Sequence, residues 1–260
     1  MRNSTPLPHS DTSFRIVELE ETDSTQAEAQ RRSGQGERGP VWISAARQTR
    51  GRGRSGREWA SLTGNFAATL LFEPGCPAAL LPQLSLVTGI AAIDAVAAHF
   101  EPFPGTPPLR LKWPNDLLIG DAKLAGILVE SRMQGDNIAA MAGVGVNIVE
   151  APEINGRVLT CLADHTATPP AVPLLLCELA QRMHDWLRVW HKGAGFPLIR
   201  EAWLARGLPV GTSMMVNSGD GPVPGTFAGL DIDGALLLLE PTGDRRRFSW
   251  GDVTLPVPMV

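Results

Sequence analysis

Residues 41–72 read VWISAARQTRGRGRSGREWASLTGNFAATLLF, and this stretch combines buried strands with a charged loop. Residues 41–45 and 65–72 are short apolar runs of the kind that form largely buried strands. Between them, residues 47–57 contain five arginines, three glycines and no acidic residue. Such a run has no apolar surface to bury and its charges repel one another, so we expect it to become ordered around a bound anion. A solvated surface loop and a nucleic-acid contact are the alternatives that this stretch alone leaves open.

The composition describes a globular protein with its positive charge concentrated in one place. The 260 residues are 43% hydrophobic and carry a net charge of −4, from 23 basic and 27 acidic residues. Without the five arginines of the loop, 18 basic residues would face the same 27 acidic ones, which argues against general nucleic-acid binding. No apolar stretch is long enough to span a membrane and no signal peptide is recognisable, so we expect a cytoplasmic protein. Cys76, Cys161 and Cys177 lack metal-ligand spacing and are expected to be reduced thiols.

Apolar spacing predicts further elements along the chain. We expect strands at 14–19, 109–113, 117–119, 124–129 and 138–146, and helices at 25–34, 80–100, 172–190 and 196–204. After residue 208 the pattern changes to short strands at 214–216, 225–229, 235–239 and 245–250, separated by turns rich in Gly, Asn and Asp. This spacing predicts a small β-barrel. We therefore divide the chain into a disordered tail (1–13), a main domain (14–208) and a C-terminal domain (209–260).

A second polar segment runs from Lys112 through Trp113, Pro114 and Asn115 to Asp116, and Lys123 follows seven residues later. Proline keeps the backbone of the preceding Trp113 extended, so the polar residues fall at the start of a strand. A hairpin turn at 120–121 would bring Lys123 back beside them. A lysine and a carboxylate so placed can hold the phosphates of a nucleotide and its Mg²⁺. A hairpin that merely exposes polar residues to solvent is the alternative.

Two weaker patterns complete the set. Residues 143–147 (GVGVN) suit a strand end that a ligand approaches closely, with Asn147 able to pair with the edge of a base. A bulged core strand explains the same residues. Asp23, Ser24 and Thr25 precede a helix that a capping box from Thr25 to Glu28 is expected to begin, and exposed hydroxyl and N–H groups there can bind a polar ligand. Capping alone also explains Thr25.

Taken together, five segments resemble those of the biotin protein ligases, in order and spacing, over nearly the whole chain. They are residues 21–25 (ETDST), 48–59 (QTRGRGRSGREW), 112–116 (KWPND), 123–130 (KLAGILVE) and 143–147 (GVGVN). The resemblance implies an α+β fold, in which helices flank a mixed β-sheet like that of class II synthetases, followed by a small SH3-like β-barrel. It also implies that biotin and ATP react to biotinyl-5′-AMP, from which biotin passes to a lysine of a biotin carboxyl carrier protein.

The resemblance also implies a role for particular residues. Those expected around biotin are Ser24, Thr25, Gln26, Gln48, Gly51, Arg52, Gly53, Arg54, Lys123 and Gly126. Those expected around ATP are Arg54, Arg57, Trp59, Asn115 and Asn147. Catalysis is expected to depend on Lys123, Arg54 and Asp116, with Asp116 also the candidate ligand for Mg²⁺.

The remaining expectations concern partners and departures from the family pattern. Some relatives carry an N-terminal helix-turn-helix, and because about a dozen residues precede the first expected strand, we expect no DNA binding. We expect a monomer or homodimer, and a carrier protein of acetyl-CoA carboxylase or a related carboxylase as acceptor. Ser55 stands where some members have arginine, which can alter retention of the adenylate. A lipoate or octanoate ligase or transferase and a nucleic-acid-binding protein are the rival readings.

Overall fold

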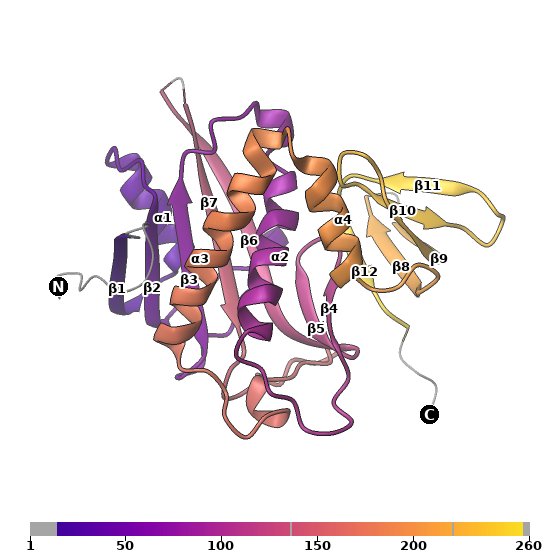
Figure 1. Cartoon of the computed structure of the whole chain (residues 1–260), viewed down its shortest axis with the longest axis horizontal. Helices are drawn as coiled ribbons and strands as arrows, with labels where there is room; N and C mark the ends of the chain where they lie inside the picture. The colour runs from indigo at the N-terminus through magenta and orange to yellow at the C-terminus, as the bar shows by residue number, and fades with distance from the viewer. Residues whose placement is uncertain (1–14, 136, 220, 257–260) are drawn as a thin grey trace.

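The computed structural model describes residues 15–135, 137–219 and 221–256 as two β-sheets and four α-helices (Figure 1). The expected tail, residues 1–13, lies outside the described residues. The larger sheet has seven strands in the order β1-β2-β3-β7-β6-β5-β4. They are β1 Arg15–Thr22, β2 Val41–Gln48, β3 Phe66–Phe72, β4 Leu109–Lys112, β5 Asp116–Ile119, β6 Ala122–Gln134 and β7 Asn137–Val146.

The sheet is mixed, as the sequence predicts. Strands β1 and β2 are parallel, and the helix α1 (Thr25–Gly34) connects them, because a parallel pair needs a crossover. The other neighbouring strands are antiparallel. Strand β6 is longer than the expected 124–129, since it pairs with β7 along the whole of a long hairpin.

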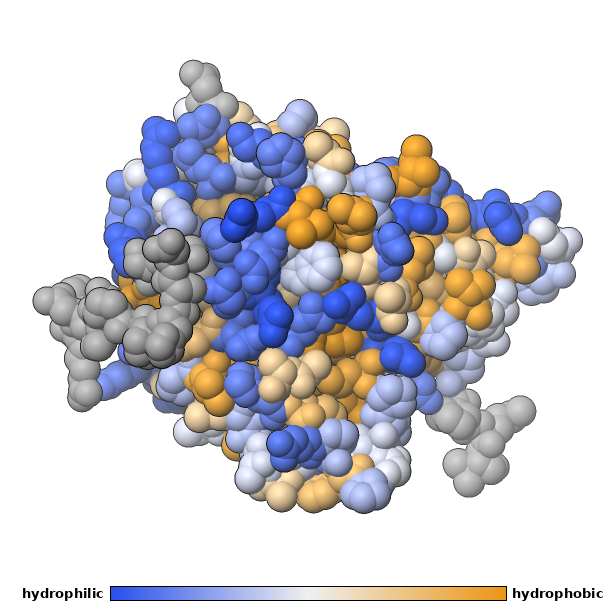
Figure 2. All heavy atoms as spheres, viewed as in Figure 1, coloured by the Kyte–Doolittle hydropathy of each residue, from blue (hydrophilic) through white to orange (hydrophobic). Residues whose placement is uncertain are grey.

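Helices cover one face of this sheet. They are α2 (Gln83–Ala97), α3 (Val172–Trp190) and α4 (Phe196–Arg206), with α2 and α3 packed side by side (Figure 1). Helix α2 is apolar on nearly all sides because it is buried on nearly all sides. It begins at Gln83 rather than at residue 80, after a short 3₁₀ turn at Ala78–Leu80. On this face of the molecule hydrophilic and hydrophobic residues are interspersed (Figure 2).

The opposite face of the sheet carries α1 and small side chains. Alternate residues of β2 and β3 divide between two clusters, with Trp42 and Leu70 in the main core and Ile43 and Leu71 in a second cluster that includes Ala29 of α1. Because successive side chains of a strand point to opposite faces, α1 lies across the sheet from α2. Further along this face the side chains are small, at Ala67, Thr69, Gly143 and Gly145, and they border a cavity.

The C-terminal residues form a five-stranded antiparallel sheet in the order β11-β10-β9-β8-β12. Its strands are β8 Ser213–Ser218, β9 Gly221–Leu230, β10 Leu236–Leu239, β11 Arg245–Phe248 and β12 Asp252–Thr254. In the described residues β11 and β12 are its two edges. The sequence predicts a small β-barrel here; the structure confirms a separate antiparallel β-sheet, which packs beside α4 (Figure 1), and among the described residues no pairing of β11 with β12 closes it into a barrel. None of the described helices has the length and apolarity needed to cross a membrane.

Candidate active site

A cavity of about 360 Å³ opens on the face of the large sheet that lacks α2. Its floor is the cross-strand pair Gly126 of β6 and Gly145 of β7, and the indole of Trp59 lies directly on both glycines. A Cβ atom at Gly145 would approach the Trp59 ring to 2.5 Å, and one at Gly126 to 3.0 Å. The two glycines are therefore needed here because a side chain would occupy the position of the ring.

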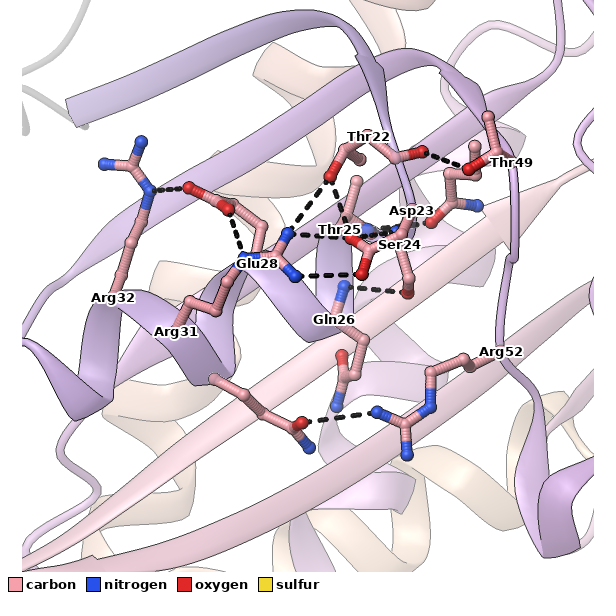
Figure 3. Close-up of polar contacts among 12 residues, drawn as sticks. Thr22, Asp23, Ser24, Thr25, Gln26, Glu28, Arg31, Arg32, Thr49 and Arg52 are labelled. Carbon is pink, nitrogen blue, oxygen red and sulfur yellow. Dashed lines mark hydrogen bonds and ion pairs between the residues drawn. The ribbon is translucent and has the colours of Figure 1, made fainter.

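One end of the cavity is formed by the start of α1. Ser24 is the N-cap, and its hydroxyl accepts a hydrogen bond from the backbone N–H of Gln26 at 3.2 Å. The capping box predicted from Thr25 to Glu28 is wrong by one residue, because Ser24 and not Thr25 is the cap. The Glu28 carboxylate forms ion pairs with Arg31 and Arg32 of the same helix (Figure 3). Because Ser24 is the cap, the hydroxyl of Thr25 takes no part in capping and bonds to Gln48 and Thr69 instead.

The turn before α1 is held by an exposed ion pair. Both carboxylate oxygens of Asp23 accept from the guanidinium of Arg31, at 2.7 and 2.8 Å, and one also accepts from the N–H of Ser24 (Figure 3). These hydrogen bonds, those from Arg31 first, keep the pKa of Asp23 well below its usual range. Asp23 therefore fixes the backbone that presents Ser24 and Thr25.

A buried hydrogen-bond network connects Thr25 to two strands. The amide oxygen of Gln48 accepts from the N–H of Thr25 at 2.9 Å and from its hydroxyl at 3.2 Å. The hydroxyl of Thr69, fully buried on β3, donates to the Thr25 hydroxyl at 2.9 Å and lies 3.3 Å from the amide oxygen of Gln26. Gln26 in turn donates to the carbonyl of Met141. The network fixes the orientation of the Gln48 amide before any ligand binds.

The arginine loop is folded as a small hairpin. The N–H of Gly53 donates to Arg57 O at 2.7 Å, and that of Trp59 donates to Gly51 O at 3.0 Å. Its tip turns through left-handed backbone at Ser55 and Gly56, with φ of 56° and 72°. A Cβ atom at Gly51 would lie 2.3 Å from the carbonyl oxygen of Trp59, so the close approach of the two arms requires glycine.

The loop arginines have partners within the protein. Arg52 contacts Gln30 and Glu130, at 3.2 and 3.5 Å, and Arg54 donates to Asn115 at 3.0 Å. Acidic and amide side chains from other elements thus supply acceptors for these guanidinium groups within the protein. That the loop becomes ordered around a bound anion stays a prediction.

At the centre of the cavity, one carboxylate lies between two lysines. Asp116 is 2.9 Å from Lys112 through one oxygen and 2.5 Å from Lys123 through the other. Burial disfavours the charged form of Asp116, but the two ammonium groups outweigh it and hold the pKa of this carboxyl below its ordinary value. Burial lowers the pKa of Lys123, against the attraction of Asp116. The Lys123 ammonium also lies over the Trp59 ring, 5.7 Å from its centroid.

The far wall of the cavity contains a buried acceptor. Asn147 is 1% exposed, and its amide nitrogen donates to Thr160 O at 3.0 Å. Its amide oxygen has no hydrogen-bond partner among the described residues, although a buried polar atom normally has one. Residues 152–159 line the same wall, and the chain there is tied to Lys123, whose N–H donates to Val158 O and whose carbonyl accepts from the N–H of Thr160. The amide oxygen of Asn147 is therefore an acceptor available to a ligand.

The geometry can now be compared with known proteins. The profile of the Biotin/lipoate A/B protein ligase family matches residues 19–147, and that of the Biotin protein ligase C terminal domain matches residues 215–255. Over 239 residues the chain is 38% identical to a biotin–[acetyl-CoA-carboxylase] ligase of Paracoccus denitrificans, covering 86% of this chain and 94% of that protein. This chain belongs to the biotin protein ligase family.

Two further comparisons agree with this membership. A biotin–[acetyl-CoA-carboxylase] ligase of Mycobacterium tuberculosis is 33% identical over 231 residues, which cover 84% of this chain and 80% of that protein. The structure of a biotin protein ligase from Aquifex aeolicus, in complex with biotin and ATP, superposes with a TM-score of 0.78 at 27% identity and covers 92% of this chain and 97% of that one. The mixed sheet with flanking helices and the small C-terminal β-domain are thus the fold of this family.

The structure of this family member gathers most of the residues singled out in the sequence. Fourteen of them line the cavity, namely Ser24, Thr25, Gln26, Gln48, Arg52, Gly53, Arg54, Arg57, Trp59, Asn115, Asp116, Lys123, Gly126 and Asn147. Gly51 lies next to it, at the base of the loop hairpin. The cavity is also lined by Gly143 of the GVGVN segment and by residues to which sequence reasoning assigned no individual role, among them Thr69, Lys112 and Asp252. Lys112 and Gly143 belong to the segments that carry the family resemblance, whereas Thr69 had no local signal.

Proposed function

We propose that this protein activates biotin with ATP and transfers it to a lysine of a biotin carboxyl carrier protein. In the first step an oxygen of the biotin carboxylate bonds to the α-phosphorus while the bond to the leaving pyrophosphate breaks, which gives biotinyl-5′-AMP. In the second step the lysine amine attacks the acyl carbon, AMP leaves and the nitrogen loses a proton. The main support is that one cavity has an uncharged polar end and a cationic centre, in a chain of the biotin protein ligase family.

The uncharged end suits the ring of biotin. The ureido group is neutral and polar, with both donors and acceptors, and hydroxyl and amide groups pair with such a group without a cost in buried charge. Ser24, Thr25 and Gln48 provide these groups; the N–H of Gln26 holds the Ser24 hydroxyl, Thr69 holds that of Thr25, and Thr25 holds Gln48. Biotin so placed would extend its carboxylate along the glycine floor toward Lys123.

The opposite end suits the nucleotide. The free amide oxygen of Asn147 can accept from the amino group of adenine, and Trp59 offers an aromatic face beside it. Arg54 and Arg57 reach the same space from the loop. A guanidinium group can donate two parallel hydrogen bonds to two oxygens of one phosphate. The residues predicted for ATP therefore form a coherent set, which we assign to that substrate.

The cationic centre addresses the main difficulty of the first step. A carboxylate and a triphosphate repel each other, and the mixed anhydride that they form is lost if water reaches it. Lys112, Lys123 and Arg54 place positive charge where the two anions must meet. We assign to Lys123 the stabilisation of the charge that develops on the reacting oxygens. The loop hairpin covers this point and limits the access of water.

The residues around Asp116 do not fit the Mg²⁺ ligand role that the sequence suggested. Both of its oxygens are engaged, one by Lys112 and the other by Lys123, within a buried site. We assign Asp116 instead to holding the two ammonium groups in position. In the described residues no group of three or more His, Cys, Asp or Glu side chains could hold a metal ion, and we derive no step through one. Action in the cytoplasm, without DNA, as a monomer or homodimer, stays a prediction.

The test is an ATP–pyrophosphate exchange assay with purified protein, followed by labelling of a biotin carrier domain. We expect exchange that depends on biotin and labelling of one lysine of the carrier. A carrier variant with that lysine replaced by arginine is the control, and it should stay unlabelled. Exchange that depends on octanoate or lipoate instead of biotin would contradict the proposal and favour the other branch of the family.

A further inference from the structure

Strand β12 of the C-terminal domain lines the cavity, and three consecutive residues, Gly251 just before the strand and its first two members, offer acceptors to cations of the larger domain. Arg54 donates to Gly251 O at 3.2 Å, Arg57 to the carboxylate of Asp252 at 2.7 Å, and Lys112 to Val253 O at 2.9 Å. Of the three acceptors, the Asp252 carboxylate alone is charged. The two domains are thus joined at the active site through groups that we assign to substrate binding.

We propose that Asp252 is a positioning residue, an internal counter-anion that holds the arginine loop in the empty enzyme and releases it to the nucleotide. This inference rests on the proposed function for the identity of the anion that displaces it. One Asp252 oxygen is 2.7 Å from Arg57 and 3.7 Å from Arg54, so a single carboxylate neutralises two neighbouring guanidinium groups. A triphosphate bound to the same arginines would take over both charges.

The ion pair between Arg57 and Asp252 is weak enough for another anion to replace the carboxylate. The side chains of Arg57 and Asp252 are each 39% exposed, and an ion pair in contact with water is weak and screened by salt. Burial lowers the pKa of Arg54, Asp252 raises it and Arg57 lowers it again, so the carboxylate offsets the repulsion between the two arginines. A triphosphate carries more negative charge than one carboxylate and accepts several hydrogen bonds from each guanidinium, so it displaces Asp252.

Competition between Asp252 and ATP for Arg57 predicts the direction in which KM for ATP changes when the carboxylate is removed. If Asp252 must give up Arg57 before ATP binds, the intact pair lowers the apparent affinity for ATP, because a ligand that requires a less populated state binds more weakly. Removing the carboxylate should then lower KM for ATP, by up to about fivefold for an exposed pair. The same change should loosen the loop when no substrate is present. A residue that only supported the fold would not improve ATP binding.

The experiment compares Asp252→Asn with Asp244→Asn, a matched control in the same domain with an exposed carboxylate in the turn between β10 and β11. Trypsin cleavage after Arg50, Arg52 or Arg54 reports the loop in the empty enzyme. We expect cleavage about threefold or more faster in Asp252→Asn, KM for ATP about threefold to fivefold lower, and kcat within about twofold. Asp252→Glu keeps the charge, so loop cleavage in this variant should be slow again. The control Asp244→Asn should be cleaved as slowly as the wild-type protein.

Salt provides an independent reading of the same contact. Raising the KCl concentration should accelerate loop cleavage in the wild-type protein and in Asp244→Asn, and have little effect in Asp252→Asn. Cleavage that is unchanged by Asp252→Asn, or a KM for ATP that rises, would overturn the proposal. The cleavage assay uses neither biotin nor ATP, so it tests the loop contact even if biotin-dependent exchange is absent, and the two proposals fail separately.

Discussion

Substituting Gly145 with alanine tests whether the glycine floor sets the position of Trp59. The added Cβ atom would meet three indole atoms at 2.5, 2.7 and 2.7 Å, whereas ordinary contacts begin at 3.4 Å. The ring must therefore retreat by about 0.9 Å, the difference between 3.4 and 2.5 Å. A displacement of about 1 Å in a substrate-positioning group costs roughly 100-fold in rate, so we expect kcat/KM for ATP to fall by about 10- to 100-fold.

The fold should tolerate this change. Trp59 is half-buried and its ring can tilt into the open cavity, so the free energy of unfolding should fall by no more than about 1 kcal/mol, the low end of the cost of overpacking. Gly89→Ala on α2 is the matched control. Its added Cβ atom would make contacts of 3.5, 3.7 and 3.8 Å, and helix propensity favours alanine, so activity and stability should be unchanged or better.

A double-mutant cycle decides whether the effect passes through the ring. In a Trp59→Ala background no indole remains to be displaced, so Gly145→Ala should lower ATP–pyrophosphate exchange by less than about threefold. Urea unfolding monitors stability in all four proteins. An equal loss of activity with and without the indole would refute the reasoning, since the glycine would then act directly on the nucleotide or on the strand.

Three further predictions concern the polar groups of the cavity. Lys123→Ala should slow adenylate formation by about 100-fold or more in single-turnover assays, because one preorganised charge is lost, and a rate within threefold of wild type would exclude that role. Thr69→Val should raise KM for biotin by about threefold to tenfold and leave KM for ATP unchanged, because it releases Thr25 and Gln26; equal changes in both values would contradict it. Asp116 has a lowered pKa in the folded protein, so its contribution to stability is present above its unfolded pKa of about 3.9 and is lost as pH falls through the folded value. In urea unfolding the advantage of wild type over Asp116→Asn should be constant from about pH 5 to 8 and shrink below about pH 4, and an advantage independent of pH down to 2 would assign it to packing.

The sequence predicts the elements of this fold well because their periodicity is strong. Strands 41–45 and 65–72, helix 172–190 and four of the five C-terminal strands were recognisable from local patterns and turn residues, whereas β12 (Asp252–Thr254) was missed. Errors arose where neighbouring residues compete for one role. Ser24 and Thr25 can both cap a helix, and which of them does so depends on Gln48, which engages Thr25 from 23 residues away.

The functional site divides in the same way. Segments dense in Arg, Gly, Lys and Asp can be recognised in the sequence, because clustered charges and glycines between apolar strands are unusual unless they bind something. Thr69 does not, because one threonine in an apolar strand has no distinguishing pattern, and its meaning depends on Thr25 lying beside it across 44 residues of sequence. Asp252 meets Arg57 across 195 residues. Contacts of this range come from the folding of the chain, and no local pattern contains them.

The boundary at residue 208 gives the last prediction. Strand β8 begins at Ser213 in the second sheet, yet apolar side chains of both sheets pack in one core. Trp203 of α4 meets Phe227 of β9 edge to face, with centroids 6.3 Å apart, and the indole of Trp113 donates to Gly234 O at 3.1 Å. Residues 14–208 were predicted to form a domain of their own. Because the two sheets share one core, removing the C-terminal sheet should lower the free energy of unfolding of the remaining chain.

Deletion of residues 209–260 should therefore leave a chain that folds but is strongly destabilised. Removing the second sheet exposes parts of Trp113, Phe196 and Trp203, all of which are at most 5% exposed in the whole protein. At roughly 1.5–3 kcal/mol for each fully exposed aromatic side chain, partial exposure of three costs about 4 kcal/mol, out of a typical 5–15 kcal/mol. Far-UV circular dichroism should keep its helical signal at low temperature, while the urea midpoint falls. An unchanged midpoint would show that the two sheets are independent, and a random-coil spectrum at low temperature would show that residues 14–208 are not a domain at all.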